Sequence, residues 1–180
     1  MSAPLMYLPV LAGIFLAVIL FSLWGIYDAL FGGEEFETSF EAVSLIAGEI
    51  RRLGKEKGTL YDLGSCYGSF SLQLQKLLPH LRIIAIDNSL FRVLLSRFRA
   101  CFKSQRPVFV HGNLFTVPMD DADIVNVYLP REMLPEIRRM LSAMEKRVLV
   151  TMFRTSFTDI QPLKIISLSK TDETVTLYAL

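Results

Sequence analysis

The residues between Tyr61 and Phe70 are the part of this chain best suited to hold a ligand. They read Tyr-Asp-Leu-Gly-Ser-Cys-Tyr-Gly-Ser-Phe, which predicts a strand that passes through a turn of small residues into a helix. Gly64 and Gly68 let the backbone approach a ligand closely, and free amides at a helix start bind polar groups such as a carboxylate. The segment predicts a site for a nucleotide-like ligand.

The glycine spacing distinguishes this turn from a dinucleotide site. A dinucleotide fold has the pattern GxGxxG, whose three glycines serve the pyrophosphate. Here Asp62 stands two residues before the first glycine, and Gly64 and Gly68 are separated by Ser65, Cys66 and Tyr67. The pattern is therefore GxxxG with a preceding acid.

Asp87 ends the next β-rich run, followed directly by Asn88. Its offset from the glycine turn is close to the one at which an acid accepts hydrogen bonds from ribose hydroxyls. A carboxylate that caps the next helix is the alternative. The glycine turn before it favours the ribose role.

Short β-rich runs alternate with helical stretches from Thr59 onward, which predicts βαβ units around a mostly parallel sheet. We expect helices at Ser69–Leu78, Leu90–Phe102 and Arg131–Met144. Only Lys170–Glu173 separates the last two of the expected strands, which predicts an antiparallel hairpin. The expected strands are Thr59–Leu63, Arg82–Asp87, Val108–His111, Asp123–Tyr128, Arg147–Phe153, Leu163–Ser169 and Thr174–Leu180.

The glycine turn resembles the first motif of class I S-adenosylmethionine methyltransferases, usually DxGxGxG. Asp62, Gly64 and Gly68 match it, whereas Cys66 replaces the middle glycine and Tyr67 stands where close relatives carry an acid. The resemblance implies an α/β, Rossmann-like seven-stranded sheet, mostly parallel with the last strand antiparallel and helices on both faces. It also implies S-adenosylmethionine as cofactor, bound through Asp62, Gly64, Ser65, Cys66, Gly68, Asp87 and Asn88.

The same resemblance gives a role to Asn113 and Leu114, which follow the third expected strand. This family carries an acid or amide there that contacts the adenine. Asn113 can donate and accept in the plane of a base. An ordinary turn asparagine is the alternative.

Two further segments resemble the small membrane-anchored protein lysine methyltransferases related to the mitochondrial ATP synthase c-subunit lysine methyltransferase. Glu37–Val43 is similar to their PTPxxV motif, with Glu37 in place of proline, and Asn126–Pro130 is similar to their VYLLP segment. The resemblance implies that Thr38 helps to close the cofactor pocket, and that Tyr128 and Pro130 line the opening for the methyl acceptor. Ordinary strand packing is the alternative for Tyr128.

The first 27 residues, Met1–Tyr27, contain no Asp, Glu, Lys, Arg or His. Within them Leu5–Ile26 is an almost unbroken apolar run, long enough as a helix of roughly 33 Å to cross a bilayer. A cleaved signal peptide and a buried core helix are the alternatives, but the run lacks a basic leader and a clear cleavage site. We therefore expect an anchor over residues 1–31, a linker and helix over 32–58 that begins at Gly32-Gly33 and is capped at Thr38 or Ser39, and a catalytic domain over 59–180.

Charge and cysteine content limit the partners, the metal chemistry and the cellular location that we expect. The net charge of +1 does not require a nucleic acid partner, and Cys66 and Cys101 have neither metal-ligand nor disulfide spacing. No metal site is expected, and His80 and His111 lie in no catalytic pattern. Basic residues follow the anchor and none precedes it, which favours a domain in the cytosol, or in the matrix of a mitochondrion. They are Arg51, Arg52, Lys55 and Lys57.

A second basic group lies in and after the helix expected from Leu90, and two interpretations remain open for it. It could face lipid phosphates, because a tethered domain stays close to headgroups, or it could be a solvated helix face. The group consists of Arg92, Arg97, Arg99, Lys103 and Arg106.

The small size of the chain favours an open site that accepts a protein segment or a lipid headgroup, and an anchor raises the effective concentration of membrane-borne substrates. The sequence therefore predicts a membrane-tethered methyltransferase that acts on lysine of a membrane or membrane-adjacent protein. Two alternatives stay open: a catalytically silent binding or scaffold module, and an enzyme that methylates a lipid or quinone-like molecule.

Overall fold

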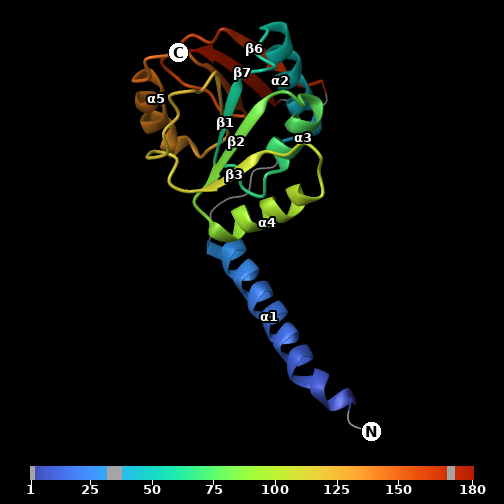
Figure 1. The fold of residues 1–180 in the computed structure, drawn as a ribbon. Coiled ribbons are helices and arrows are strands. Elements are labelled where there is room, and N and C mark those ends of the chain that lie inside the picture. The colour runs from blue at the N-terminus through green and yellow to red at the C-terminus, as the bar shows by residue number, and fades with distance from the viewer. Residues whose placement is uncertain (1–2, 32–37, 170–172) are drawn as a thin grey trace. The chain divides into compact units, whose positions relative to one another are not determined.

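The computed structural model describes residues 3–31, 38–169 and 173–180. The chain divides into two compact units, Met1–Glu35 and Phe36–Leu180 (Figure 1). The expected linker start at Gly32-Gly33, Glu37 of the PTPxxV-like segment and most of the turn Lys170–Glu173 lie outside the described residues.

The first unit contains a single apolar helix, α1 (Ala3–Phe31). Its stretch Tyr7–Asp28 has a mean hydropathy of 2.4, and the most apolar part of this stretch is not buried inside the protein. By length and composition this helix can cross a membrane. The predicted span Leu5–Ile26 lies within it.

The second unit is built on one seven-stranded sheet in the order β3-β2-β1-β4-β5-β7-β6. Strand β1 pairs in parallel with β2 on one side and with β4 on the other, whereas β7 pairs antiparallel with both β5 and β6. The predicted α/β sheet, including the antiparallel last strand, is confirmed. The strands are β1 (Thr59–Leu63), β2 (Arg82–Asp87), β3 (Val108–His111), β4 (Ile124–Val127), β5 (Leu149–Phe153), β6 (Lys164–Ser167) and β7 (Thr174–Ala179).

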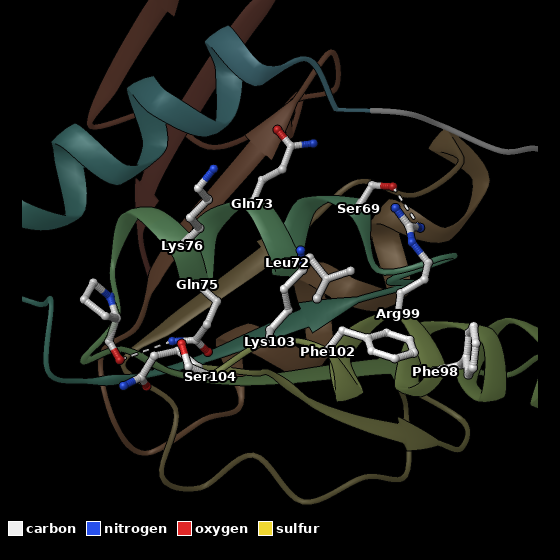
Figure 2. Close-up of a pocket in the computed structure, with 12 residues that line it drawn as sticks. Ser69, Leu72, Gln73, Gln75, Lys76, Phe98, Arg99, Phe102, Lys103 and Ser104 are labelled. Atoms are coloured by element: carbon white, nitrogen blue, oxygen red, sulfur yellow. Dashed lines mark hydrogen bonds between the residues drawn. The ribbon is translucent and has the colours of Figure 1, made fainter.

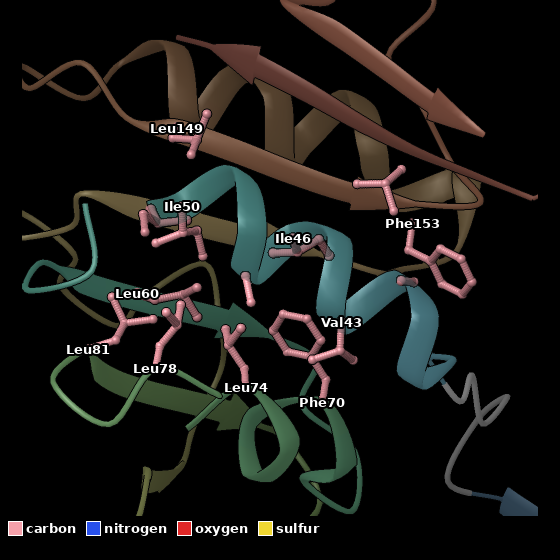
Figure 3. Packing of buried hydrophobic residues seen from close by; sticks show 14 of the residues in the cluster. Val43, Ile46, Ile50, Leu60, Phe70, Leu74, Leu78, Leu81, Leu149 and Phe153 are labelled. Carbon is pink, nitrogen blue, oxygen red and sulfur yellow. The ribbon is translucent and has the colours of Figure 1, made fainter. Parts of the chain in front are cut away.

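Helices cover both faces of this sheet. Helices α2 (Phe40–Arg52) and α3 (Ser69–Leu77) pack through buried aliphatic and aromatic side chains on one face (Figure 3). Helix α4 (Leu90–Cys101) lies against β2 and β3, where Val93 and Ala100 pack with Leu72 of α3. On the other face, α5 (Leu134–Ser142) shares the core with loop residues such as Met119 and Phe157.

The helix before β1 belongs to the compact unit that contains the sheet. Of the two predicted caps, Ser39 is the one used: its side chain accepts a hydrogen bond from the amide of Ala42. Ile46 and Ile50 are fully buried against the sheet. The amphipathic pattern read from the sequence therefore places α2 correctly.

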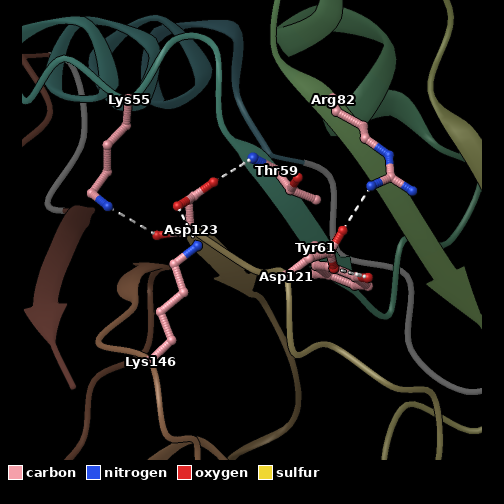
Figure 4. Close-up of polar contacts among 7 residues, drawn as sticks. All are labelled: Lys55, Thr59, Tyr61, Arg82, Asp121, Asp123 and Lys146. Carbon is pink, nitrogen blue, oxygen red and sulfur yellow. Dashed lines mark hydrogen bonds and ion pairs between the residues drawn. The ribbon is translucent and has the colours of Figure 1, made fainter.

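The predicted strand start at Asp123 and helix start at Arg131 are displaced in the structure. Asp123 precedes β4 and instead accepts the amide of Thr59 at 2.9 Å and an ion pair from Lys146 at 2.7 Å (Figure 4). The Lys146 contact, with the Thr59 amide, holds the pKa of Asp123 below its usual value. Residues Arg131–Met133 form a 3₁₀ turn, η1, before α5 begins.

Helix α2 provides a matched pair of stability variants. Ile46→Ala removes a buried side chain and should lower the free energy of unfolding by about 2–5 kcal/mol. Gly48 faces solvent with open space where a Cβ would stand, so Gly48→Ala should raise it by roughly 0.5–1 kcal/mol. Urea unfolding of the detergent-solubilised chain, followed by circular dichroism, measures both. Equal effects would contradict this packing of α2.

Candidate functional site

A row of polar side chains crosses the centre of the sheet beneath α3. Asp62 on β1, Asn126 on β4 and Thr151 on β5 occupy adjacent register positions. Asn126 donates to Asp62 at 2.9 Å and accepts the Thr151 hydroxyl at 2.8 Å. Ser71, in the first turn of α3, closes the row by donating to the other Asp62 oxygen at 2.6 Å. All four side chains are buried.

Burial raises the pKa of Asp62 to about 6, although the bonds from Ser71 and Asn126 act in the opposite direction. Each carboxylate oxygen of Asp62 has a hydrogen-bond partner within the protein, Ser71 for one and Asn126 for the other. We assign Asp62 to holding the start of α3 against the sheet. Its part in cofactor binding stays a prediction.

The turn that follows β1 is fixed by backbone bonds to β2. The amides of Gly64 and Ser65 both donate to the carbonyl of Ile86, at 3.0 and 2.9 Å. Gly64 and Gly68 have φ of +74° and +72°, a left-handed conformation that favours glycine. Cys66 adopts φ +51° between them. The turn is thus held in one defined conformation.

Neighbouring side chains also leave no room for a larger residue at Gly64 or Gly68. A Cβ on Gly64 would lie 2.5 Å from Cδ2 of Leu129, and one on Gly68 would lie 2.5 Å from Cε1 of Phe109. Close packing within the protein is therefore sufficient to explain the GxxxG spacing.

Ser65 supplies an observation that packing does not explain. Its side chain is 6% exposed. Its hydroxyl oxygen is buried without a hydrogen-bond partner among the residues that the structure describes. Because buried polar groups are generally bonded, this hydroxyl is suited to a ligand atom at the turn.

Asp87 joins the turn to the end of β2. Its Oδ2 accepts the amide of Cys66 at 2.7 Å, and its Oδ1 accepts the amide of Ser89 at 2.9 Å. The N-cap of α4 is Ser89, not Asp87, because the Ser89 hydroxyl accepts the Arg92 amide. The bond to the Cys66 amide places Asp87 beside the glycine turn, and its ribose role stays a prediction. Asn88 beside it is exposed, and its carbonyl lies 3.1 Å from Nε2 of His111.

Asn113 forms a local turn. Its Oδ1 accepts the amide of Phe115 at 3.0 Å, and its carbonyl accepts the amide of Thr116. Leu114 packs partly buried against the core on the α5 face. The preceding Gly112 amide donates to the carbonyl of Asp87, so the two predicted positions lie at neighbouring strand ends.

Tyr128 combines strand packing with a polar contact. Its ring lies edge-on to Phe153, with ring centroids 5.2 Å apart, and its hydroxyl accepts a bond from Arg154 at 3.1 Å. Burial is the main cause of its raised pKa. Pro130 precedes η1 and is half-buried, and Thr38 is buried before α2.

Sequence reasoning gave no role to Arg154, Ser71 or Thr151. Arg154 has φ +59° and forms an ion pair with Glu173 while it donates to Tyr128. Asn126 and Thr151 carried a usable signal, because both are polar within otherwise apolar strands. Arg154 carried none, since its partners Tyr128 and Glu173 lie far from it in the chain, next to β4 and β7.

The structure therefore gathers most of the predicted positions at the carboxyl ends of adjacent strands. The turn follows β1, Asp87 ends β2, Asn113 follows β3, and Leu129 reaches Gly64 from beyond β4. Ligands of open α/β sheets bind at this edge, where the strand order reverses between β1 and β4.

No family model and no curated protein matches this chain. Solved structures do. An RNA methyltransferase from Salinibacter ruber, in complex with S-adenosyl-L-homocysteine, aligns with a TM-score of 0.67 and 20% identity, over 80% of this chain and 93% of its own. Magnesium protoporphyrin IX methyltransferase from Synechocystis, with bound S-adenosylmethionine, gives 0.60 and 13% over 87% and 90%.

A third solved structure, a putative O-methyltransferase from Nostoc punctiforme, gives a TM-score of 0.58 and 16% identity over 77% of this chain and 55% of its own. These likenesses concern the fold. The second unit of this chain has the class I methyltransferase fold.

Asp62 generates a pH prediction. Its folded pKa is raised, so its contribution to stability is present below the unfolded value near 3.8 and is lost as the pH rises through about 6. A rise of this size corresponds to about 3 kcal/mol. Asp62→Asn should therefore gain stability relative to the parent chain between pH 4 and pH 7, measured by urea unfolding. Asp120→Asn, an exposed acid, is the control, and parallel curves for Asp62→Asn and the parent would refute the assignment.

Proposed function

We propose that this chain is an S-adenosylmethionine-dependent methyltransferase held at a membrane by α1, and that it methylates lysine on a membrane or membrane-adjacent protein. The observation that carries the proposal is the pairing of Asp87 with the Cys66 amide at the carboxyl edge of the sheet. This pairing places a buried carboxylate beside a left-handed glycine turn at the strand-order reversal.

The residues at this edge are chemically suited to an adenosyl ligand. Asp87 is positioned to accept hydroxyl protons of a ribose, and the Ser65 hydroxyl is available for a polar group of the ligand. Asn113 would face the base from the neighbouring strand end, although its side chain is already used in a local turn. Neighbours of the same fold hold S-adenosylmethionine or S-adenosyl-L-homocysteine, which supports the choice of cofactor.

The bound cofactor would supply a methyl group already activated by a sulfonium. A lysine amine aligned in its neutral form at the acceptor side could receive that methyl group, and its surplus proton would then pass to water. The protein therefore needs mainly to align the amine and exclude water. No acid–base pair is required for this step.

Tyr128 is suited to aligning the amine. Its hydroxyl already accepts from Arg154, and a hydroxyl oxygen has two lone pairs, so a second donor such as an amine N–H can bind there. Arg154 is in turn held by Glu173, which fixes the direction of the hydroxyl. Tyr128 and Pro130 would thus form the acceptor side of the site.

The form of the domain supports a macromolecular acceptor. The described connections between β3 and β4 and between β5 and β6 contain no helix. Little chain is therefore left to close a lid over a small metabolite. A helix that can span a membrane would keep such an open site near membrane proteins.

A silent scaffold is the second candidate, and one observation favours it. Leu129 and Phe109 account for both glycines by packing alone, and both Asp87 oxygens already accept backbone amides. A turn packed this closely needs no cofactor for its stability. Cofactor binding separates the two candidates directly.

Calorimetric titration with S-adenosyl-L-homocysteine tests the cofactor site. The parent chain should bind in the micromolar range. Asp87→Asn should bind roughly 10–150-fold more weakly, because a hydrogen bond to a charged group contributes about 1.5–3 kcal/mol. Asp120→Asn should bind normally, and thermal melting without ligand shows whether the turn of Asp87→Asn remains folded. Absence of binding by the parent chain at millimolar ligand would leave the scaffold as the function.

Labelled S-adenosylmethionine, incubated with the full chain and membranes, tests the acceptor. Label should enter protein and appear as methyl-lysine on hydrolysis. Tyr128→Phe keeps the ring contact with Phe153 but lacks the hydroxyl, so transfer should slow about ten-fold with unchanged cofactor affinity. Label in extracted lipid would instead identify a lipid or quinone-like acceptor.

A further inference from the structure

Helix α4 turns a stripe of apolar side chains toward solvent. Leu90, Leu94, Phe98 and Phe102 recur every fourth residue, which places them on one side of the helix. Phe98 is 62% exposed and Phe102 is 72% exposed, and their rings pack edge to face with centroids 5.3 Å apart. We call these four residues the α4 stripe.

A hollow of about 750 Å³ lies between α3 and α4, beside the α4 stripe (Figure 2). Phe98 and Phe102 form one wall of it. Lys76 of α3, Lys103 just beyond α4 and Arg99 add positive charge to its lining. Neither lysine forms an ion pair with any residue in the described part of the chain.

The surroundings of the α4 stripe are strongly positive. Between Asp62 and Asp120 the sequence contains one acid, Asp87, and that acid is buried. The exposed cations of the same segment are Lys76 on α3, Arg97 and Arg99 on α4, Lys103 and Arg106 just after α4, and Arg82 at the start of β2, which is paired with Asp121. Arg97 and Arg99 donate to the carbonyls of Phe109 and Tyr67, which orients them without neutralising them.

We propose that the α4 stripe and the hollow beside it dock on a bilayer that contains anionic phospholipid. Apolar side chains would enter the headgroup boundary, and the surrounding cations would bind lipid phosphates, as in interfacial amphipathic helices. This inference rests on the proposed anchoring by α1. It orients the domain at the membrane, in addition to tethering it.

The length of the connection supports this occupant. Residues 32–39 join Phe31 at the end of α1 to Phe40 at the start of α2. A chain of this length spans at most about 30 Å, so insertion of α1 keeps the domain within reach of the headgroups.

Two other occupants agree less well with the α4 stripe. A second copy of the same face would oppose like charges across a two-fold axis. A single-stranded nucleic acid would use the cations and the rings, but Leu90 and Leu94 have no aromatic face on which bases stack. Hydrocarbon accommodates both leucines and both phenylalanines.

Tryptophan quenching by lipid tests the docking. The full chain with Trp24→Phe, which removes its one tryptophan, is reconstituted in vesicles of phosphatidylcholine brominated on its acyl chains, with and without phosphatidylserine. A tryptophan placed by Phe98→Trp should be quenched, and more strongly with phosphatidylserine. The matched position is Ile165→Trp, equally exposed on β6 at the opposite edge of the sheet, which should stay unquenched.

Charge variants test the electrostatic part. Lys103→Glu with Arg106→Glu should weaken the docking equilibrium at least about ten-fold, since each cation near an anionic surface contributes roughly five-fold. Lys57→Glu reverses an exposed charge outside this face and should leave quenching unchanged.

The outcomes separate the docking from the proposed function. Extraction of the chain from vesicles by alkaline carbonate would overturn both the anchor and the docking. Retention with equal or absent quenching at positions 98 and 165 would overturn the docking alone. Quenching of the position-98 tryptophan by single-stranded RNA but not by lipid, or its burial in a crosslinked dimer, would also overturn it. Cofactor binding is measured separately and is unaffected by these results.

Discussion

The buried bond between Asp62 and Asn126 is the interaction on which the candidate site depends. It links β1 to β4, the two strands between which the strand order reverses, and Thr151 extends it to β5. Ser71 attaches α3 to the same carboxylate. An unpaired polar group in this position would be costly, so the row is satisfied only in one register. The turn between β1 and α3 inherits its position from that register.

A second carboxylate, Asp87 at the end of β2, binds the turn. It accepts a hydrogen bond from the amide of Cys66, which adopts a left-handed conformation between two glycines. The two acids therefore stabilise different parts of the site. Asp62 holds β1 and α3 on either side of the turn, and Asp87 holds the turn itself. A methyltransferase benefits from this rigidity, since its activated substrate requires alignment more than acid–base chemistry. The same rigidity would also serve a scaffold, which is why ligand affinity is the decisive property.

Acidic residues and exposed cations lie on different parts of the domain. Near the amino ends of β1 and β4, Asp123 and Asp121 accept hydrogen bonds from Thr59 and Tyr61 within the protein. The α3 and α4 side is almost free of acid and exposes aromatic side chains beside lysine and arginine. Sequence periodicity identified α4, but its solvent face became apparent only when the structure placed Val93 and Ala100 against the sheet. A bilayer partner for that face would orient the carboxyl edge relative to membrane substrates.

The sequence by itself determined the apolar N-terminal helix, the seven strands and the glycine turn with its following acid. These features are local, because hydrophobic periodicity and turn chemistry act over a few residues. The strand start at Asp123 was misplaced, because this residue contacts Thr59 and Lys146, which lie far away in the chain. The helix start at Arg131 was misplaced, because Arg131–Met133 form a 3₁₀ turn before α5. The tertiary structure alone decided that Asp62 bonds Asn126, that Arg154 holds Tyr128, and that Leu129 packs on Gly64. Each joins residues far apart in the chain, and pairing across a sheet depends on register, which no local pattern records.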